Sequence, residues 1–319
     1  MNVRRHYISG LATVSATALA LGALSACSGS AVAGNTDKFD VVASFYPMAY
    51  LAERIGGRHV NVTSLTEPGQ EPHDLEISAR QRAQLEESDA ALYLKGLQPT
   101  VDEAVAQSGV KTKIDTAALT TLEDFGTGDG HDEAGSGEEG HAEGEHARDP
   151  HLWLDPAKYA EVARGVGTAF AKADPDHAAD YKKNTAGLVE KLTALDTAFE
   201  EGLRDTKSKV FFTNHASFGY LAHRYGLTQE AISGLDPESE PSAARVRELQ
   251  REAGADGVTT VFYETLVSDK TARTLARDAG LRTDVLDPLE GITDTSRGHD
   301  YMQVMESNLD ALKKALGGK

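Results

Sequence analysis

Three histidines lie in loop segments whose residue types could bind a metal ion. His73 and His151 each follow a proline, and His215 comes directly after a predicted strand. A single loop histidine is more often an ordinary hydrogen-bonded residue than a ligand. Imidazole is nevertheless a good ligand for Zn²⁺, and three imidazoles with one carboxylate complete a tetrahedral site. The three histidines together therefore predict a metal site.

The composition limits the ligands that such a site can have. The chain of 319 residues has one cysteine, Cys27, so it can form neither an intramolecular disulfide nor a cysteine-rich zinc site. Its formal net charge of -18 argues against nucleic acid as a partner, because a phosphate backbone is bound by positive charge. We therefore expect a site made of histidine and carboxylate, on a protein that concentrates cations near its surface.

The elements that must position these histidines alternate along the chain. Strands are predicted at residues 40–45, 59–65, 90–94, 209–214, 258–264 and 283–286. Helices are predicted at residues 48–55, 78–87, 156–172, 241–253, 268–279 and 300–316. Such alternation is typical of parallel strands joined by helical crossovers. Since ligands of open α/β sheets bind outside the carboxyl ends of the strands, His73 and His215 are expected at those ends.

One long helix separates the two alternating regions. Apolar residues spaced by three, four or seven run through the segment after Pro175, and no turn signal interrupts it before about Leu203. At 1.5 Å per residue such a helix is about 40 Å long. The sequence therefore predicts an α/β protein with two similar lobes, residues 38–174 and 206–319. They contain parallel sheets and are joined by one long linking helix at residues 175–205.

An acidic segment at residues 123–149 interrupts the first lobe. It contains ten acidic residues, seven glycines and three histidines, and almost no apolar residue. Because it cannot bury a core, we expect a mobile loop. Its histidines, His131, His141 and His146, could form an auxiliary metal-binding loop, or the loop could be a solvated spacer.

The N-terminus has the layout of an export signal. Arg4 and Arg5 precede an apolar stretch at residues 8–24, and Cys27 ends the sequence LSAC, which resembles the bacterial lipobox. The resemblance implies a signal peptide at residues 1–26, cleavage before Cys27 and acylation of its sulfur. Residues 27–37 would then be a lipid-anchored tether on the outer face of the cell membrane. The alternative is an incidental thiol near an ordinary cleavage site.

Several segments together resemble one known family, the zinc/manganese solute-binding lipoproteins of ABC importers (cluster A-I). They occur in family order over roughly residues 38–318, at residues 71–76, 149–156, 214–220, 234–242 and 286–291. The resemblance implies two α/β lobes bridged by a rigid helix, with one metal ion in the cleft. It also implies a monomer that is not an enzyme, that captures Zn²⁺ and that delivers it to a membrane permease.

The resemblance further implies which residues bind the metal. His73, His151 and His215 match the histidine ligands of the family, and Glu290 is the most natural match to its carboxylate ligand. Glu264, Asp287 and a water molecule remain alternatives for the fourth position. Asp74 and Asp155 are the nearby candidates to hold the second ring nitrogens of the ligating histidines. The acidic loop resembles the histidine-rich loop of zinc-importing members, which implies weak zinc capture or sensing.

Other functions remain open at this point. Three imidazoles and one carboxylate favour zinc over manganese, which prefers more oxygen ligands, although a manganese-carrying member of the family is an alternative. A secreted zinc hydrolase would need an open ligand position, and the chain has no His-Glu-x-x-His helix. An adhesin built on the same fold is the remaining alternative.

Overall fold

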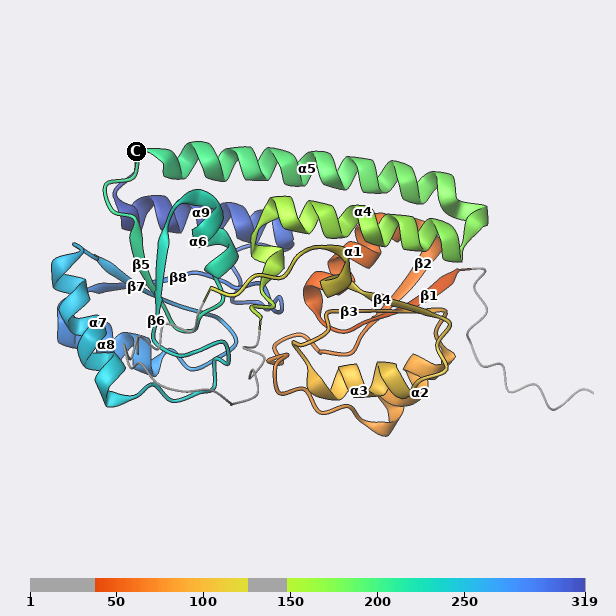
Figure 1. The fold of residues 1–319 in the computed structure, drawn as a ribbon, viewed down its shortest axis with the longest axis horizontal. Helices are drawn as coiled ribbons and strands as arrows, with labels where there is room; N and C mark the ends of the chain where they lie inside the picture. Colours follow the sequence, from red (N-terminus) through yellow and green to blue (C-terminus); the bar gives the residue numbers. More distant parts are fainter. Residues whose placement is uncertain (1–37, 126–147, 319) are drawn as a thin grey trace, which may run out of the picture. The chain divides into compact units, whose positions relative to one another are not determined.

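Two four-stranded parallel sheets form the framework of the protein (Figure 1). The computed structural model describes residues 38–125 and 148–318. The first sheet has the order β2-β1-β3-β4 and the second the order β6-β5-β7-β8, with all neighbours parallel, so the second sheet repeats the topology of the first. The strands are β1 (Phe39–Ala43), β2 (Val60–Ser64), β3 (Ala90–Tyr93), β4 (Thr112–Asp115), β5 (Val210–Thr213), β6 (Thr228–Ala231), β7 (Thr260–Tyr263) and β8 (Arg282–Val285). The half around the first sheet is called the N-terminal lobe below, and the half around the second sheet the C-terminal lobe.

Helices cover both faces of each sheet. In the N-terminal lobe, α2 (Ala79–Glu87) and α3 (Pro99–Gln107) bury Leu85 and Val101 against one face, and α1 (Tyr46–Gly56) packs on the other. In the C-terminal lobe, α7 (Ala243–Ala255) and α8 (Lys270–Ala279) bury Leu249 and Leu275 against one face. The other face is covered by α6 (Gly219–Tyr225) and α9 (Tyr301–Leu316). Burial on both faces explains why the central strands are almost entirely apolar.

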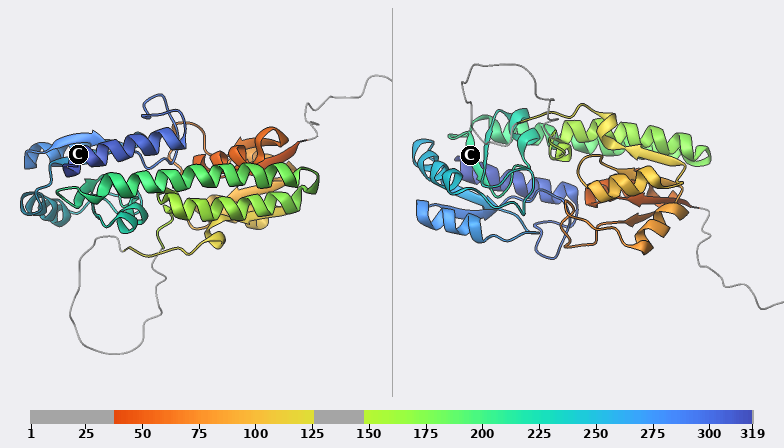
Figure 2. Two further views of the ribbon diagram at one scale, coloured as in Figure 1. Left: turned by 90° about the horizontal axis from the view of Figure 1, so that it is seen from above. Right: turned by 60° about the horizontal axis from the view of Figure 1, so that its bottom comes forward.

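A layer of long helices runs past both sheets (Figures 1 and 2). Helix α5 (Ala178–Arg204) packs against α4 (Pro156–Ala173), α1 and α9, and thus against elements of both lobes. Its 27 residues correspond to about 40 Å. It buries a stripe of residues that consists of Tyr181, Thr185, Leu188, Leu192, Leu195, Phe199 and Leu203. The main hydrophobic core is therefore continuous from one lobe to the other, since it contains both Val41 of β1 and Phe211 of β5.

The structure confirms the predicted fold class and adds elements that the sequence did not indicate. The strands β4 and β6 and the helix α3 were not predicted. Both strands lie at a sheet edge, and each has only one buried residue, Ile114 or Ala231, so the apolar run that marks a buried strand is missing. The predicted linking helix begins with a short 3₁₀ turn, Pro175–His177, before α5.

Some predictions fall on residues outside the described ranges. These are the signal peptide at residues 1–26, the tether at residues 27–37 with Cys27, and His131, His141 and His146 of the acidic loop. Within the ranges that are described, none of the helices combines the length and the apolar character needed to cross a bilayer.

Candidate metal centre

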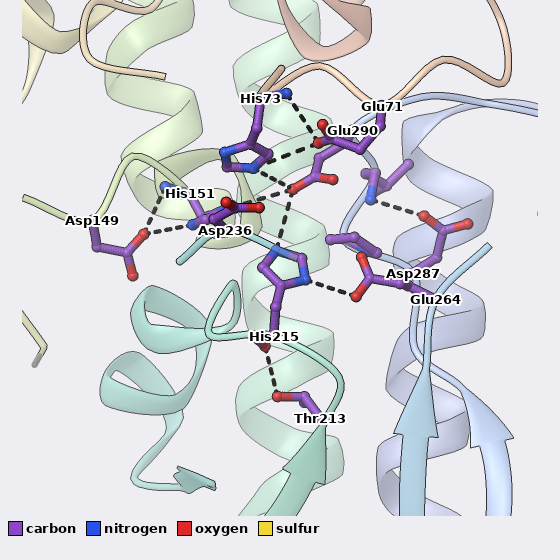
Figure 3. A network of polar contacts seen from close by, with 12 residues as sticks. Glu71, His73, Asp149, His151, Thr213, His215, Asp236, Glu264, Asp287 and Glu290 are labelled. Atoms are coloured by element: carbon purple, nitrogen blue, oxygen red, sulfur yellow. Dashed lines mark hydrogen bonds and ion pairs between the residues drawn. The ribbon is translucent and has the colours of Figure 1, made fainter. Parts of the chain in front are cut away.

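Four predicted residues, far apart in the sequence, meet at one point between the sheets (Figure 3). Glu290 Oε1 lies 3.2 Å from His73 Nε2, 3.3 Å from His151 Nε2 and 3.4 Å from His215 Nε2. One ligand atom from each of the four residues lies within 4.8 Å of all the others. The structure therefore brings together the four side chains that the sequence analysis named.

Loops at the ends of strands deliver these side chains from both lobes. His73 lies in the loop between β2 and α2, and His151 lies directly before the 3₁₀ turn Leu152–Leu154 that leads into α4. His215 follows β5, and Glu290 follows β8. The ends of parallel strands meet at one edge of a sheet, which is where α/β proteins bind their ligands.

Carboxylates hold two of the imidazole rings from behind. Asp149 Oδ1 accepts hydrogen bonds from the main-chain N–H of His151 and from its Nδ1, both at 2.8 Å. Glu264 Oε1 accepts a hydrogen bond from His215 Nδ1 at 2.7 Å. A proton on Nδ1 leaves the lone pair of Nε2 free, and in both residues Nε2 faces the centre. The two carboxylates therefore select the tautomer that can bind a cation.

The centre is buried, and three of its inner polar atoms have no hydrogen-bond partner. Glu290 and His151 are fully buried, His215 is 1% exposed, and His73 is closest to solvent. Among the described residues, the buried polar atoms without a hydrogen-bond partner include His151 Nε2, His215 Nε2 and Glu290 Oε2. Unpaired buried polar atoms are costly, so a cluster of them at one point indicates a missing ligand.

The charges around the centre favour a cation. Burial by itself would lower the pKa of His151 and of His215, but Asp149, Glu264 and Glu290 outweigh it, so the pKa of His151 is raised and that of His215 is raised well above its ordinary value. Burial likewise acts to raise the pKa of Glu290, yet the three imidazoles hold it well below its usual range. The surroundings thus stabilise positive charge at the centre.

The three alternative carboxylates lie differently relative to the centre. Glu264 contacts the Nδ1 side of His215 and so orients a ring instead of facing the centre. Asp287 accepts hydrogen bonds from the main-chain N–H of Leu289 and from the hydroxyl of Thr265, and so serves its own loop. Of the three carboxylates, Glu290 alone belongs to the converging group.

The prediction that Asp74 and Asp155 hold the second ring nitrogens of the ligating histidines was wrong. Asp155 caps the first turn of α4, where its Oδ1 accepts hydrogen bonds from Ala157 and Lys158. Asp74 is exposed, and its main-chain N–H donates to Glu71. The sequence analysis missed the actual partner of His151, Asp149. Asp155 precedes Pro156 and the helix predicted from residue 156, which is the pattern of a helix N-cap, and this signal could have left Asp149 as the flanking aspartate that orients the ring.

Two α/β lobes contribute three imidazoles and one carboxylate to a single buried point between their sheets. This architecture is that of a two-lobed binding protein with a site for a metal ion. Residues 41–315 match the model of the ZnuA family, zinc-uptake complex component A, periplasmic. The chain belongs to this family, which confirms the resemblance to the zinc-type cluster A-I proteins.

Named relatives support the same assignment. The chain is 39% identical over 286 residues to the zinc-binding lipoprotein AdcA of Streptococcus pneumoniae, covering 87% of this chain and 56% of that protein. It thus spans about half the length of that relative. It is 33% identical over 318 residues to the high-affinity zinc uptake system protein ZnuA of Bacillus subtilis, covering 97% of each.

Solved structures share the fold. The Zn(II)-bound ZnuA-like domain of Streptococcus pneumoniae AdcA superimposes with a TM-score of 0.71 at 34% identity, covering 88% of this chain and 99% of that one. The laminin-binding protein Lmb of Streptococcus agalactiae, described as a bifunctional protein with adhesin and metal transporting activity, gives a TM-score of 0.76 at 27% identity, covering 87% and 99%.

Proposed function

We propose that this protein is the extracytoplasmic zinc-binding component of an ABC importer. It binds one Zn²⁺ with His73, His151, His215 and Glu290 and delivers the ion to a membrane permease. The observation that carries this proposal is the convergence of three imidazole Nε2 atoms on one buried carboxylate oxygen. The zinc-binding relatives that share the fold support it.

The donor set suits zinc better than manganese. Zn²⁺ accepts four ligands in a tetrahedron and binds imidazole nitrogen at about 2.0–2.1 Å, whereas Mn²⁺ prefers a larger number of oxygen ligands. The centre offers three nitrogens and a carboxylate, and Asp149 and Glu264 fix two of the imidazoles in the binding tautomer. We therefore propose zinc, and not manganese, as the transported ion.

The same donor set argues against a hydrolase. Catalytic zinc typically has three protein ligands and one open position for water. Here Glu290 fills the fourth position from a fully buried place. We infer that the protein is a carrier and not an enzyme.

The proposed location follows from the N-terminus. We propose that Cys27 carries a lipid and that residues 27–37 tether the protein to the outer face of the cell membrane, after removal of residues 1–26. We further propose that it acts as a monomer, with residues 38–174 and 206–319 as lobes on either side of the helix at residues 175–205.

Growth under zinc limitation tests the function. Cells that lack this protein should grow poorly in chelator-treated medium, and added zinc or the wild-type gene should restore growth, whereas a gene encoding His151→Ala should not. Full growth of the deletion strain without added zinc would contradict the importer function, provided that no second zinc importer is active.

An adhesin function is the second candidate, because the laminin-binding protein Lmb shares the fold. Purified protein would then bind immobilised laminin with a saturable curve. Binding that is the same for the wild type and for His151→Ala would show an adhesive surface independent of the metal centre.

Replacing Glu264 by glutamine should weaken zinc binding by about 10- to 100-fold. The amide keeps the size of the side chain but no longer stabilises the positive charge on the imidazole of His215. Competition with a chromophoric chelator measures the loss. Glu230→Gln is a matched control, since Glu230 pairs with Arg245 and does not contact the centre. Equal losses in both variants would contradict an orienting role for Glu264.

Deleting residues 126–146 should remove weak zinc binding and leave the tight site intact. The two ends of the acidic loop are closed by described residues, because the N–H of Asp149 donates to Glu123 O at 3.0 Å. The hydroxyl of Tyr220 also accepts from the N–H of Glu123 and donates to Asp149 O, at 2.8 and 2.9 Å. Calorimetry should therefore show one tight site in both proteins and extra weak sites only in the full chain. A tight site lost on deletion would contradict the assignment.

A further inference from the structure

The residue before Glu290 has an unusual backbone. Leu289 has φ of 59°, and among the described residues it is the one non-glycine residue with a positive φ. A bulky residue rarely adopts this conformation, because its Cβ crowds the neighbouring carbonyl oxygen. Strained residues persist only where their surroundings hold them, and they cluster at functional sites. The contacts of this loop therefore show what holds Glu290 in place.

Two side chains hold the start of the loop. The main-chain N–H of Asp287 donates to Asn308 Oδ1 at 2.9 Å, and Asn308 Nδ2 donates to Asp287 O at 2.7 Å. The carboxylate of Asp287 accepts a hydrogen bond from the N–H of Leu289 at 2.8 Å. All of these residues are buried, so the bonds are shielded from water. Together they fix the backbone on the N-terminal side of the turn.

A further contact comes from the loop that carries His151. The indole Nε1 of Trp153, the single tryptophan of the chain, donates a hydrogen bond to Pro288 O at 2.7 Å. This carbonyl belongs to the peptide bond between Pro288 and Leu289, so the bond acts directly on the strained turn. The rings of Trp153 and His151 lie 5.2 Å apart. One fully buried residue therefore contacts both a histidine of the centre and the loop of its carboxylate.

Trp153 is itself held in place from both lobes. Its ring packs edge-on against Phe45, which follows β1, at 5.0 Å between centroids. Its main-chain oxygen accepts a hydrogen bond of 2.6 Å from the hydroxyl of Tyr301, at the start of α9. The indole therefore has little freedom to follow a displaced Pro288, and it can act as a fixed support.

We propose that Trp153 is a positioning residue for zinc binding, through its hydrogen bond to Pro288 and hence through Glu290. This inference rests on the proposed zinc-binding function, and it deepens it. The indole does not contact the ion. It keeps the left-handed turn at Leu289 from relaxing, and so keeps Glu290 Oε1 within reach of all three imidazoles. A buried indole N–H needs a hydrogen-bond acceptor even where it positions nothing. The test must therefore separate an effect on the position of Glu290 from a general loss of stability.

A double-mutant cycle makes this separation. Trp153→Phe removes the donor and keeps an aromatic ring, and it should weaken zinc binding by about 10-fold. If the effect passes through the carboxylate, the same change in a Glu290→Gln background should cost less than about 2-fold. Tyr159→Phe is the matched control. It removes a fully buried hydroxyl that donates to the main-chain oxygen of Pro47 and keeps the ring that packs on Tyr301, so its zinc affinity should stay within about 2-fold of wild type.

Asn308→Ala serves as the second variant in case Trp153→Phe does not fold. It loosens the same loop from α9 without touching Trp153, and it should show the same loss and the same dependence on Glu290. Unchanged affinity in the folded variant would overturn the inference, and so would an equal loss in the Glu290→Gln background. Wild-type protein that binds no zinc would overturn the proposed function itself. If the wild type binds zinc and Trp153→Phe binds it equally tightly, only the role of Trp153 is overturned.

Discussion

Replacing His215 by alanine should lower the zinc affinity by roughly 100- to 1000-fold. Structural zinc sites with four ligands have apparent binding free energies of about 10–16 kcal/mol, so one ligand accounts for about 2.5–4 kcal/mol, and each 1.4 kcal/mol is tenfold. His215 is 1% exposed, and the other two histidines of the converging group, His73 and His151, are already counted as ligands. Its loss also leaves Glu264 buried without its imidazole partner. We therefore expect the upper part of this range.

Competition with a chelator of known affinity measures this loss, and His223→Ala provides the control. His223 is the next histidine along the chain, on α6, and its side chain is 69% exposed and lies against Phe125. Its replacement should leave the affinity unchanged. Wild-type affinity in His215→Ala would contradict the assignment of His215 as a ligand, even if the overall stoichiometry remained one.

Saturating zinc should stabilise the folded protein by about 4 kcal/mol at a free concentration of 1,000 times Kd. The ligands come from both lobes, from His73 in one to Glu290 in the other, so the unfolded chain cannot offer the same site. For a chain of this size we expect the midpoint of thermal unfolding to rise by about 8 °C or more. Scanning calorimetry with and without zinc measures the shift, and a chelator should reverse it.

The variant His151→Ala tests whether this shift arises at the centre. It should lose most of the zinc-dependent stabilisation, because Nε2 of His151 is one of the converging atoms. Calcium, which prefers oxygen ligands in larger number, should give no comparable shift in the wild type. A zinc-dependent shift of full size in His151→Ala would place the stabilising ion elsewhere on the protein.

The fold could be predicted from the sequence wherever strands are buried on both faces. The strands β1, β3, β5 and β7 are central and apolar, and the residue pattern indicated each of them. The edge strands differ among themselves. The sequence indicated β2 and β8, but β4 and β6 have the polar sequences TKID and TQEA, and only their pairing with a neighbour makes them strands.

The site could be predicted in part. The positions of His73, His151 and His215 in loops made them candidates, but Glu290 emerged only from the family resemblance, since 217 residues separate it from His73. The sequence analysis did not assign the orienting carboxylates. Asp149 lies two residues before His151 in the same loop and could have been named, whereas Glu264 is 49 residues from His215 and reaches it only through the packing of separate loops. A sequence shows which side chains could bind a metal ion, but tertiary contacts decide which of them face it.

The most direct test of the zinc site is anomalous diffraction at the zinc absorption edge, from crystals of the protein with one equivalent of zinc. We predict a single strong peak about 2.0–2.2 Å from the Nε2 atoms of His73, His151 and His215 and from a carboxylate oxygen of Glu290. A single peak at any other group of residues, with these four side chains still bonded to one another, would contradict the central claim.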